Sequence, residues 1–173
     1  MDFSLVQSIS GVRGFSPFLD WGIIFFAEYL PYFLVIATSI FVLREHSRKE
    51  RAHIFLVTLL TLILSRGIIT ETIRFFYHRP RPFVALQFTP LFSELHYAFP
   101  SGHAAFLFAL ACVMWSFNKT WGYWFFGFAL LNGIARVLAG VHWPSDIVGG
   151  ICVALISFFI ISYFAEEKIF QEK

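Results

Sequence analysis

The chain has 173 residues, of which 58% are hydrophobic and only 14% are charged, and its mean hydropathy is +0.70. An ordinary soluble domain, in which about a quarter of the residues are charged, is therefore excluded. The net charge of +2 says little about partners, and we expect no nucleic acid among them. These values predict one integral membrane domain over residues 1–173, of the all-α class, built as a polytopic bundle of about five to six spans.

The amino-terminal third begins with a short, mildly amphipathic stretch over residues 1–10, which predicts a helix lying at the membrane interface. Residues 21–43 are long and apolar enough to span a bilayer with some tilt, although they contain Glu28 and Pro31. A carboxylate inside a membrane is costly. Glu28 is therefore expected either to form an ion pair, for which Arg66 is one candidate, or to serve a functional site.

The loops between apolar runs predict the topology. Residues 44–53 carry four basic side chains against two acidic ones, which places them in the cytoplasm. Residues 75–99 contain three prolines and are expected to pack over the outer end of the bundle. The amino end then lies outside and the charged tail over residues 166–173 lies inside. The four further spans are predicted at Ile54–Thr72, Ser101–Phe117, Trp121–Leu138 and Ile147–Phe164. Tryptophans expected near span ends, as in an aromatic belt, are Trp21, Trp115, Trp121, Trp124 and Trp143.

Three polar clusters interrupt the apolar sequence, at residues 74–82, 100–103 and 136–146, and this topology puts all three at the outer face. In the second cluster Ser101 can cap a helix whose free N–H groups and dipole favour an anion. A capped helix with a surface histidine is the alternative for that short pattern. In the first cluster Glu71 and Arg74 share a helix face, so Glu71 either orients Arg74 or forms a simple ion pair at the helix end.

Taken together, the clusters resemble the three-part signature of the type 2 phosphatidic acid phosphatase superfamily. The residues that carry this resemblance are Arg74, Arg81 and Pro82, then Pro100, Ser101, Gly102 and His103, then Arg136, His142 and Asp146. The family usually has Lys where this chain has Arg74, and Ser where it has Ala135. Neither departure removes a cation, although the first changes donor geometry. The resemblance implies a membrane-embedded lipid phosphatase, which is a hydrolase.

A phosphatase without a metal must neutralise its substrate with side chains. The expected phosphate-binding residues are Arg74, Arg81, Ser101, Gly102 and Arg136, with Arg79 as a further candidate. The spacing of His142 and Asp146 lets the carboxylate hold one ring nitrogen protonated while the other attacks. The resemblance implies that His142 is the nucleophile, His103 the general acid and Asp146 the orienting residue. It also implies a phosphohistidine intermediate, and we expect neither a metal nor another cofactor.

The expected substrate is a lipid phosphate or pyrophosphate from the bilayer. Residues 25–30 and 78–83 resemble the bacterial undecaprenyl pyrophosphate phosphatase branch, and Arg79 adds a cation that suits a diphosphate. We therefore predict conversion of undecaprenyl pyrophosphate to undecaprenyl phosphate at the outer face of the bacterial plasma membrane. Phosphatidylglycerol phosphate and lipid A 1-phosphate are alternative substrates. A haem protein with His103 and His142 as ligands, or a silent scaffold or channel, are alternatives of other classes. The role of His78 and the oligomeric state stay open.

Overall fold

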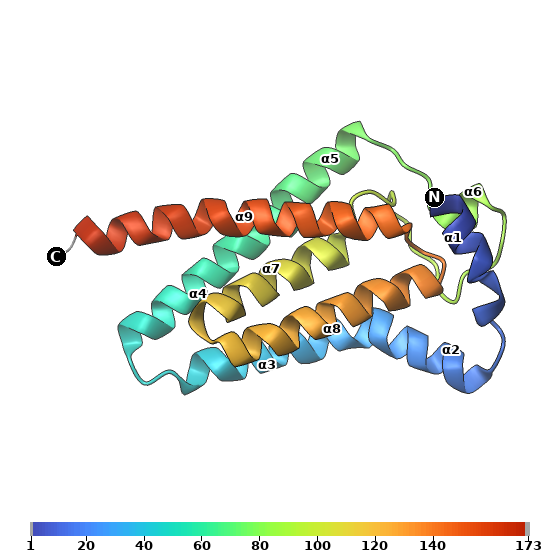
Figure 1. Cartoon of the computed structure of the whole chain (residues 1–173). Coiled ribbons are helices and arrows are strands. Elements are labelled where there is room, and N and C mark those ends of the chain that lie inside the picture. The colour runs from blue at the N-terminus through green and yellow to red at the C-terminus, as the bar shows by residue number, and fades with distance from the viewer. Residues whose placement is uncertain (1, 172–173) are drawn as a thin grey trace.

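The computed structural model describes residues 2–171, except for the side chains of Ser10 and of residues 166–171. Within this range every regular element is a helix, which confirms the all-α class. Five long helical rods form a bundle (Figure 1). The first rod joins α2 (Pro17–Ile24), the π-helical η2 (Phe25–Tyr29) and α3 (Leu30–Arg44). The second joins α4 (Arg48–Leu62), the π-helical η3 (Ile63–Ile69) and α5 (Thr70–Phe76). The others are α7 (Gly102–Phe117), α8 (Lys119–Leu138) and α9 (Pro144–Gln171).

All five expected spans are therefore helices, but they differ in length and apolarity. Among the described residues three helices are long and apolar enough to cross a membrane, namely Pro17–Arg44, Arg48–Phe76 and Pro144–Ala165. The apolar helix α7 is shorter. At a rise of about 1.5 Å per residue it extends about 24 Å, whereas the hydrocarbon core of a bilayer is about 30 Å thick. Helix α7 is therefore too short to span the hydrocarbon core by itself, whereas α8, with 20 residues, extends about 30 Å.

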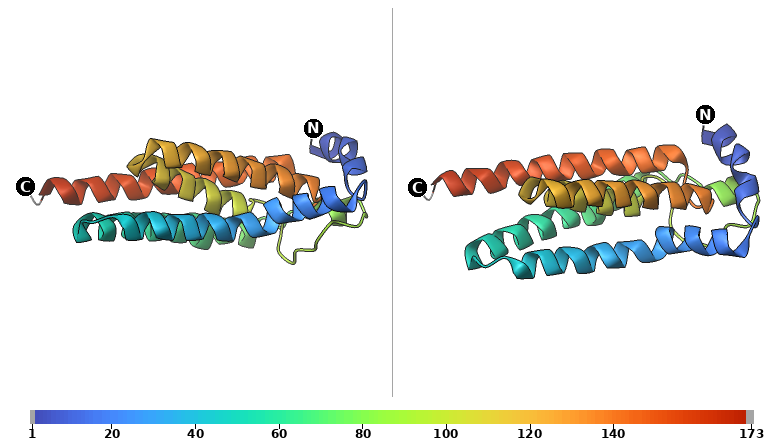
Figure 2. Two further views of the ribbon diagram at one scale, coloured as in Figure 1. Left: turned by 90° about the horizontal axis from the view of Figure 1, so that it is seen from below. Right: turned by 60° about the horizontal axis from the view of Figure 1, so that its bottom comes forward.

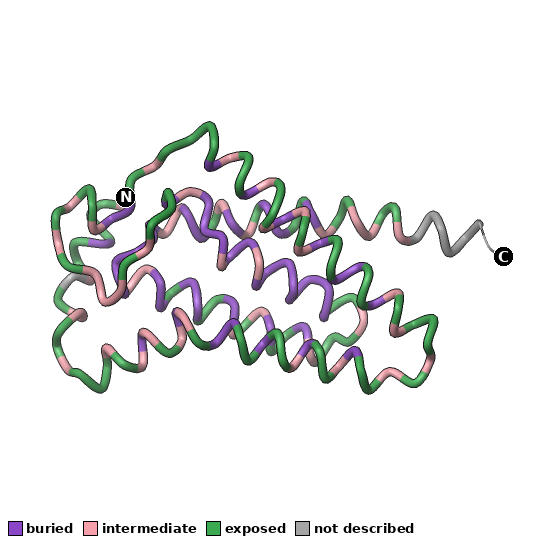
Figure 3. Tube along the Cα trace, turned by 180° about the vertical axis from the view of Figure 1, so that it is seen from behind, coloured by how far each residue is buried: buried purple, intermediate pink, exposed green. Residues whose placement is uncertain are grey.

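Helix α7 is the centre of the bundle. Eleven of its 16 residues are buried, whereas large apolar side chains on the outer rods are exposed, as a lipid-facing surface requires (Figure 3). Glycine permits a close helix contact here: a Cβ placed on Gly150 would lie 2.6 Å from the Ser101 carbonyl oxygen. The first turns of α7 and α9 thus meet. There the Ser101 N–H donates to the Asp146 carbonyl at 2.9 Å.

Pro31 interrupts the first rod and frees acceptors for α8. Proline has no N–H, so Pro31 cannot donate to the carbonyls of Ala27 or Phe26, which lie four and five residues earlier. Instead the Asn132 amide donates to both carbonyls, at 2.7 Å to Phe26 and 3.0 Å to Ala27. Arg136 Nη1 donates to the Ala27 carbonyl at 3.0 Å. The proline therefore lets two buried side chains of α8 bind the backbone of η2.

The two ends of the bundle differ in their chemistry. At one end α1 (Asp2–Ser8) and η1 (Ser10–Val12) lie across the rods, beside the segment 77–101 that contains α6 (Pro82–Ala85) (Figures 1 and 2). The basic stretch between α3 and α4 lies at the opposite end. The backbone of α9 is helical as far as Gln171, but the side chains of the expected charged tail lie outside the described residues.

The sequence predicted Trp143 to belong to an aromatic belt, and this prediction is wrong. Its ring is buried, and its indole N–H donates to the Pro80 carbonyl at 3.0 Å. It packs in a small cluster with Val6 of α1 and Ala98. A tryptophan close to a span end can therefore serve the internal packing of the loops instead of facing lipid. Trp21 and Trp124, by contrast, are largely exposed, as a belt requires.

Candidate active site

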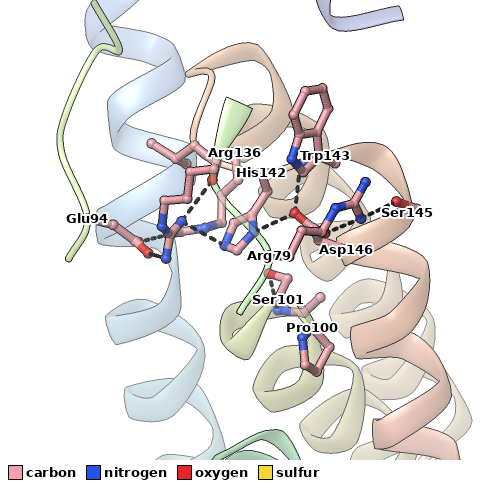
Figure 4. A network of polar contacts seen from close by, with 12 residues as sticks. Arg79, Glu94, Pro100, Ser101, Arg136, His142, Trp143, Ser145 and Asp146 are labelled. Carbon is pink, nitrogen blue, oxygen red and sulfur yellow. Dashed lines mark hydrogen bonds and ion pairs between the residues drawn. The ribbon is translucent and has the colours of Figure 1, made fainter. Parts of the chain in front are cut away.

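The three polar clusters converge at the end of the bundle that α1 covers (Figure 4). They come from the end of α5, the turn before α6, the start of α7, the end of α8 and the turn before α9. His103 is half-buried on the first turn of α7. The expected site residues that are buried are Arg74, Arg81, Ser101, Gly102, Arg136, His142 and Asp146. Burial of this many charged groups at a single place is costly unless each is paired, so their partners define the site.

His142 and Asp146 are joined directly. His142 Nδ1 lies 3.3 Å from Asp146 Oδ2, and the same oxygen accepts the Trp143 backbone N–H at 2.8 Å. Asp146 is the third residue of α9, and a carboxylate there commonly binds the N–H of the residue that precedes the helix. Its other oxygen accepts from Arg79 Nη1 at 2.7 Å. The carboxylate is thus fixed on three sides, which directs the Nε2 atom of His142 away from it.

Arg81 and Arg136 face the Nε2 side of His142. Arg81 Nη1 lies 3.4 Å from His142 Nε2 and donates to the Val141 carbonyl at 2.8 Å. Glu94 bridges the two arginines, at 2.5 Å from Arg81 Nη2 and in contact with Arg136 Nη2. These two Nη2 atoms and Arg136 Nε are nevertheless buried without a well-oriented hydrogen bond. An anion with more acceptor oxygens than a carboxylate can satisfy them, and phosphate is such an anion.

Arg74 fixes the entrance to α7. Its Nε and Nη2 atoms both donate to the Pro100 carbonyl, at 3.3 Å and 3.0 Å. This fork needs a guanidinium, which explains how Arg replaces the usual Lys here. Ser101 is the N-cap of α7, since its hydroxyl accepts the Ala104 N–H at 3.4 Å. The first turn of α7 therefore presents free N–H groups and a positive dipole end beside the arginines.

Burial sets the protonation of two groups in the loops. It lowers the pKa of the Arg81 guanidinium to about 10, although the charge of Asp146 opposes this shift. Burial also holds the pKa of the His142 ring well below its usual value, and the charges of Arg136 and Arg81 act in the same direction. At neutral pH Arg81 is therefore a cation and His142 is a neutral imidazole with a lone pair.

Arg79 is held by two carboxylates and a hydroxyl. Its guanidinium binds the carboxylates of Asp146 and Asp2, the latter at 2.9 Å, and the Ser145 hydroxyl at 2.7 Å. It therefore lies on the Asp146 side of the site, and its contact with substrate phosphate stays a prediction. Because Asp2 also contacts Ser145, the amino-terminal helix is tied to the residues that hold His142 in place.

Two pairings predicted from sequence have different outcomes. The possible pair of Glu28 with Arg66 is wrong, because Arg66 forms its ion pair with Glu71. The predicted contact between Glu71 and Arg74 is confirmed, at 3.5 Å. His78 is exposed and stacks on a neighbouring aromatic ring, Tyr97, at 4.3 Å between centroids.

Sequence reasoning missed several residues of the site. Glu94 lies in an irregular segment with no periodicity, so nothing in the sequence distinguished it. The bond from the Trp143 N–H to Asp146 had a detectable signal, because Pro144 marks the first turn of a helix in which Asp146 is a natural cap. Among the described residues, no group of three or more His, Cys, Asp or Glu side chains is placed to hold a metal ion.

Comparison with known proteins identifies the family. Residues 55–170 match the PAP2 superfamily. The chain belongs to that superfamily. PAP2 proteins of this kind are membrane lipid phosphatases, and the chain is accordingly a membrane-embedded hydrolase of lipid phosphates. This assignment replaces the haem-protein and scaffold alternatives.

Similar PAP2 proteins differ in the substrates that their names state. The chain is 28% identical over 169 residues to undecaprenyl-diphosphatase BcrC of Bacillus subtilis (strain 168), a match that covers 96% of this chain and 85% of that protein. It is 31% identical over 118 residues to phosphatidylglycerophosphatase B of the same organism, covering 61% and 56% of the two chains. The crystal structure of Aquifex aeolicus LpxE superposes with a TM-score of 0.73 at 30% identity, covering 92% and 93%.

Proposed function

We propose that His142 is the nucleophile of this PAP2 phosphatase, that His103 is its general acid and that Asp146 orients His142. The observation that supports this best is the setting of the His142 ring. Its Nδ1 faces the Asp146 carboxylate at 3.3 Å, while its Nε2 faces Arg81 at 3.4 Å. A neutral ring with one nitrogen held by a carboxylate and the other beside buried cations is suited to attack an anionic phosphoryl group.

The reaction then takes two steps. In the first, His142 Nε2 forms a bond to phosphorus, the bond from phosphorus to the leaving oxygen breaks, and His103 gives that oxygen a proton. In the second, water attacks the phosphohistidine, His103 takes a proton from the water, and inorganic phosphate leaves. The expected phosphate cradle is Arg74, Arg81, Ser101, Gly102 and Arg136. Its charges neutralise the phosphoryl oxygens throughout, which is the main requirement of phosphoryl transfer.

We propose a lipid diphosphate as the substrate, with undecaprenyl pyrophosphate as the leading candidate and undecaprenyl phosphate as its product. The similarity to undecaprenyl-diphosphatase BcrC over 96% of the chain supports this choice. Phosphatidylglycerol phosphate is the second candidate, supported by the shorter match to phosphatidylglycerophosphatase B. Lipid A 1-phosphate is a third. A cavity of about 350 Å³ between α3, α4 and α7, lined mainly by apolar side chains, offers space for part of a lipid chain.

We also propose that the site faces the outside of the bacterial plasma membrane. The basic stretch around Arg48 lies at the opposite end of the bundle from His142, and basic loops favour the cytoplasm. The arginines at the site end are largely paired with carboxylates, among them Glu94 and Asp146. Their charge is therefore largely neutralised and does not favour a cytoplasmic location of this end.

Substitution of the two histidines tests the assignment. His142→Ala should abolish turnover of a lipid phosphate in detergent, and the acid-labile radiolabelled intermediate formed by wild type should disappear. His103→Ala should retain slow formation of that intermediate and should lose most activity on substrates with poor leaving groups. His46→Ala, which removes an exposed histidine at the far end of the bundle, is the matched control and should behave as wild type.

Two results would contradict these roles. Activity of His142→Ala within tenfold of wild type would exclude it as the nucleophile. An equal defect of His103→Ala on good and poor leaving groups would exclude it as the acid.

A further inference from the structure

Arg66 lies beside the active site, although no sequence motif and no step of the mechanism above uses it. It belongs to the π-helical segment η3 inside the second rod. π-helical turns occur frequently at functional sites, and a charged side chain within an apolar rod is costly and usually functional. A role for Arg66 must therefore be sought in what its guanidinium contacts.

The guanidinium of Arg66 lies against the first turn of α7. A Cβ placed on Gly102 would be 2.6 Å from Arg66 Nε and 3.0 Å from its Cζ. The contact is possible because residue 102 has no side chain. Gly102 directly precedes His103 in the chain. Arg66 is thus a cation on the His103 side of the site.

The four arginines Arg66, Arg74, Arg81 and Arg136 form two pairs, and one carboxylate bridges each pair. Glu94 bridges the Arg81–Arg136 pair next to His142. Glu71 bridges the Arg66–Arg74 pair, since its Oε1 contacts Arg66 Nη1 and lies 3.5 Å from Arg74 Nη1. The carboxylate oxygens stand in for phosphate oxygens, because a guanidinium fork binds both groups in the same way.

The two anion positions differ in exposure. The side chains of Arg81, Arg136 and Glu94 are 3%, 0% and 21% exposed, whereas those of Arg66, Arg74 and Glu71 are 38%, 7% and 47% exposed. The position beside His142 is therefore the more enclosed of the two, and the position beside His103 opens to the outside of the rods at Arg66 and Glu71. A lipid phosphate bound at the enclosed position then directs its chain toward the open one.

We propose that Arg66 and Arg74 form a second phosphate subsite, which binds the inner phosphate of a lipid diphosphate while the outer phosphate lies between Arg81 and Arg136. This inference rests on the proposed function, because it takes His142 as nucleophile and His103 as acid. The oxygen that bridges the two phosphates then leaves with the inner phosphate, next to the histidine that protonates it. Binding of the diphosphate displaces Glu71 from Arg66.

The test compares farnesyl diphosphate with farnesyl phosphate, which share one lipid chain, as substrates of the purified full chain in the same detergent. The readout is the ratio of kcat/KM for the diphosphate to kcat/KM for the monophosphate. Arg66→Gln should lower this ratio at least tenfold, and Arg66→Lys, which keeps the charge, should restore most of it. Arg48→Gln removes an exposed arginine at the other end of the same rod and should leave the ratio unchanged.

Glu71→Gln provides a second test that does not remove a cation. It frees Arg66 from its competing anion, so the KM for the diphosphate should fall relative to that for the monophosphate. An unchanged ratio in Arg66→Gln, equal losses on the two substrates, or a Glu71→Gln variant with unchanged relative KM would each overturn the subsite. Failure of the proposed function gives a different result, because wild type would then hydrolyse neither lipid, or His142→Ala would remain active.

Discussion

Replacement of Pro31 by alanine should lower activity without lowering stability. The Ala27 carbonyl accepts one hydrogen bond from Asn132 and one from Arg136, which occupies both of its lone pairs. The new N–H of residue 31 would compete for this carbonyl, because in an α-helix the N–H of residue 31 donates to the carbonyl of residue 27. Arg136 is fully buried. Within the described residues, the bond from its Nη1 to the Ala27 carbonyl is the one well-oriented hydrogen bond of its side chain. Arg136 would therefore lose its hydrogen bond to the first rod and keep only its ion pair with Glu94, while the helix itself became more stable.

The expected magnitudes have opposite signs. A hydrogen bond from a charged donor contributes about 1.5–3 kcal/mol, which corresponds to a loss of about 10- to 150-fold in kcat/KM if Arg136 acts mainly on the transition state. Replacing proline by alanine inside a helix favours the folded state by up to about 3 kcal/mol. The assays are kcat/KM on a lipid phosphate in detergent and the midpoint of thermal unfolding for the same preparation.

Pro17→Ala is the matched control, because Pro17 is an exposed first residue of α2 and a proline is well tolerated at that position. It should change neither kcat/KM nor the unfolding midpoint appreciably. Wild-type activity in Pro31→Ala would refute the reasoning. So would a loss of activity that runs parallel to a fall in the unfolding midpoint, since that result would mean general damage to the first rod instead of a displaced Arg136.

Three further predictions concern pH, the amino-terminal helix and topology. The pKa of His142 is held well below 6.5, and only the neutral ring attacks. As the pH is lowered, kcat/KM should therefore be maintained through pH 6.5 and decline only below it. A decline centred at pH 6.5 would contradict the reasoning. Asp2→Asn removes one of the two carboxylates that Arg79 binds, and it should speed hydrogen exchange in α1 by about two- to fivefold, as loss of a partly buried ion pair worth about 0.5–1 kcal/mol requires. Unchanged exchange would show that α1 is held by apolar contacts alone. In intact cells a cysteine at Ser47 should be protected from an impermeant thiol reagent and one at Ser93 should react, whereas the reverse pattern would place the site in the cytoplasm.

The sequence predicted the helical rods and the convergence of the three clusters because both depend on strong local signals. Apolar runs of about 20 residues have few alternatives to a helix, and the spacing between His142 and Asp146 places them within one turn. The contacts that hold the site could not be predicted in the same way. Arg136 binds a carbonyl 109 positions earlier in the chain, and only the packing of α8 against η2 brings the two together. Glu94 reaches the site from an irregular segment, where no periodicity indicates direction.

Two residues have neighbours in the structure that their place in the sequence did not indicate. Arg79 was expected at the phosphate because it lies two residues from Arg81, and residues two apart share a side in a regular extended segment. Residues 77–81 do not form a regular strand, and Pro80 separates the two arginines. Arg81 faces His142 and Glu94, while Arg79 faces Asp146 and Asp2. Trp143 was assigned to the membrane interface by its place at a span end, but the loops fold back over this end of the bundle and cover it.

The pairing of arginines with carboxylates has a consequence for substrate binding. A buried guanidinium without a partner costs several kcal/mol, so Arg81 and Arg136 need an anion whether or not a lipid is present. Glu94 supplies one in this structure. A phosphate that binds there must replace a carboxylate, and the affinity is then the difference between two ion pairs instead of the full strength of one. The charge and number of oxygens of the incoming group decide that difference. A dianionic phosphate has the advantage over a single carboxylate, whereas the inorganic phosphate released at the end must compete with the returning carboxylate of Glu94. Such an exchange allows a deeply buried, strongly positive site to bind its substrate selectively and still release its product.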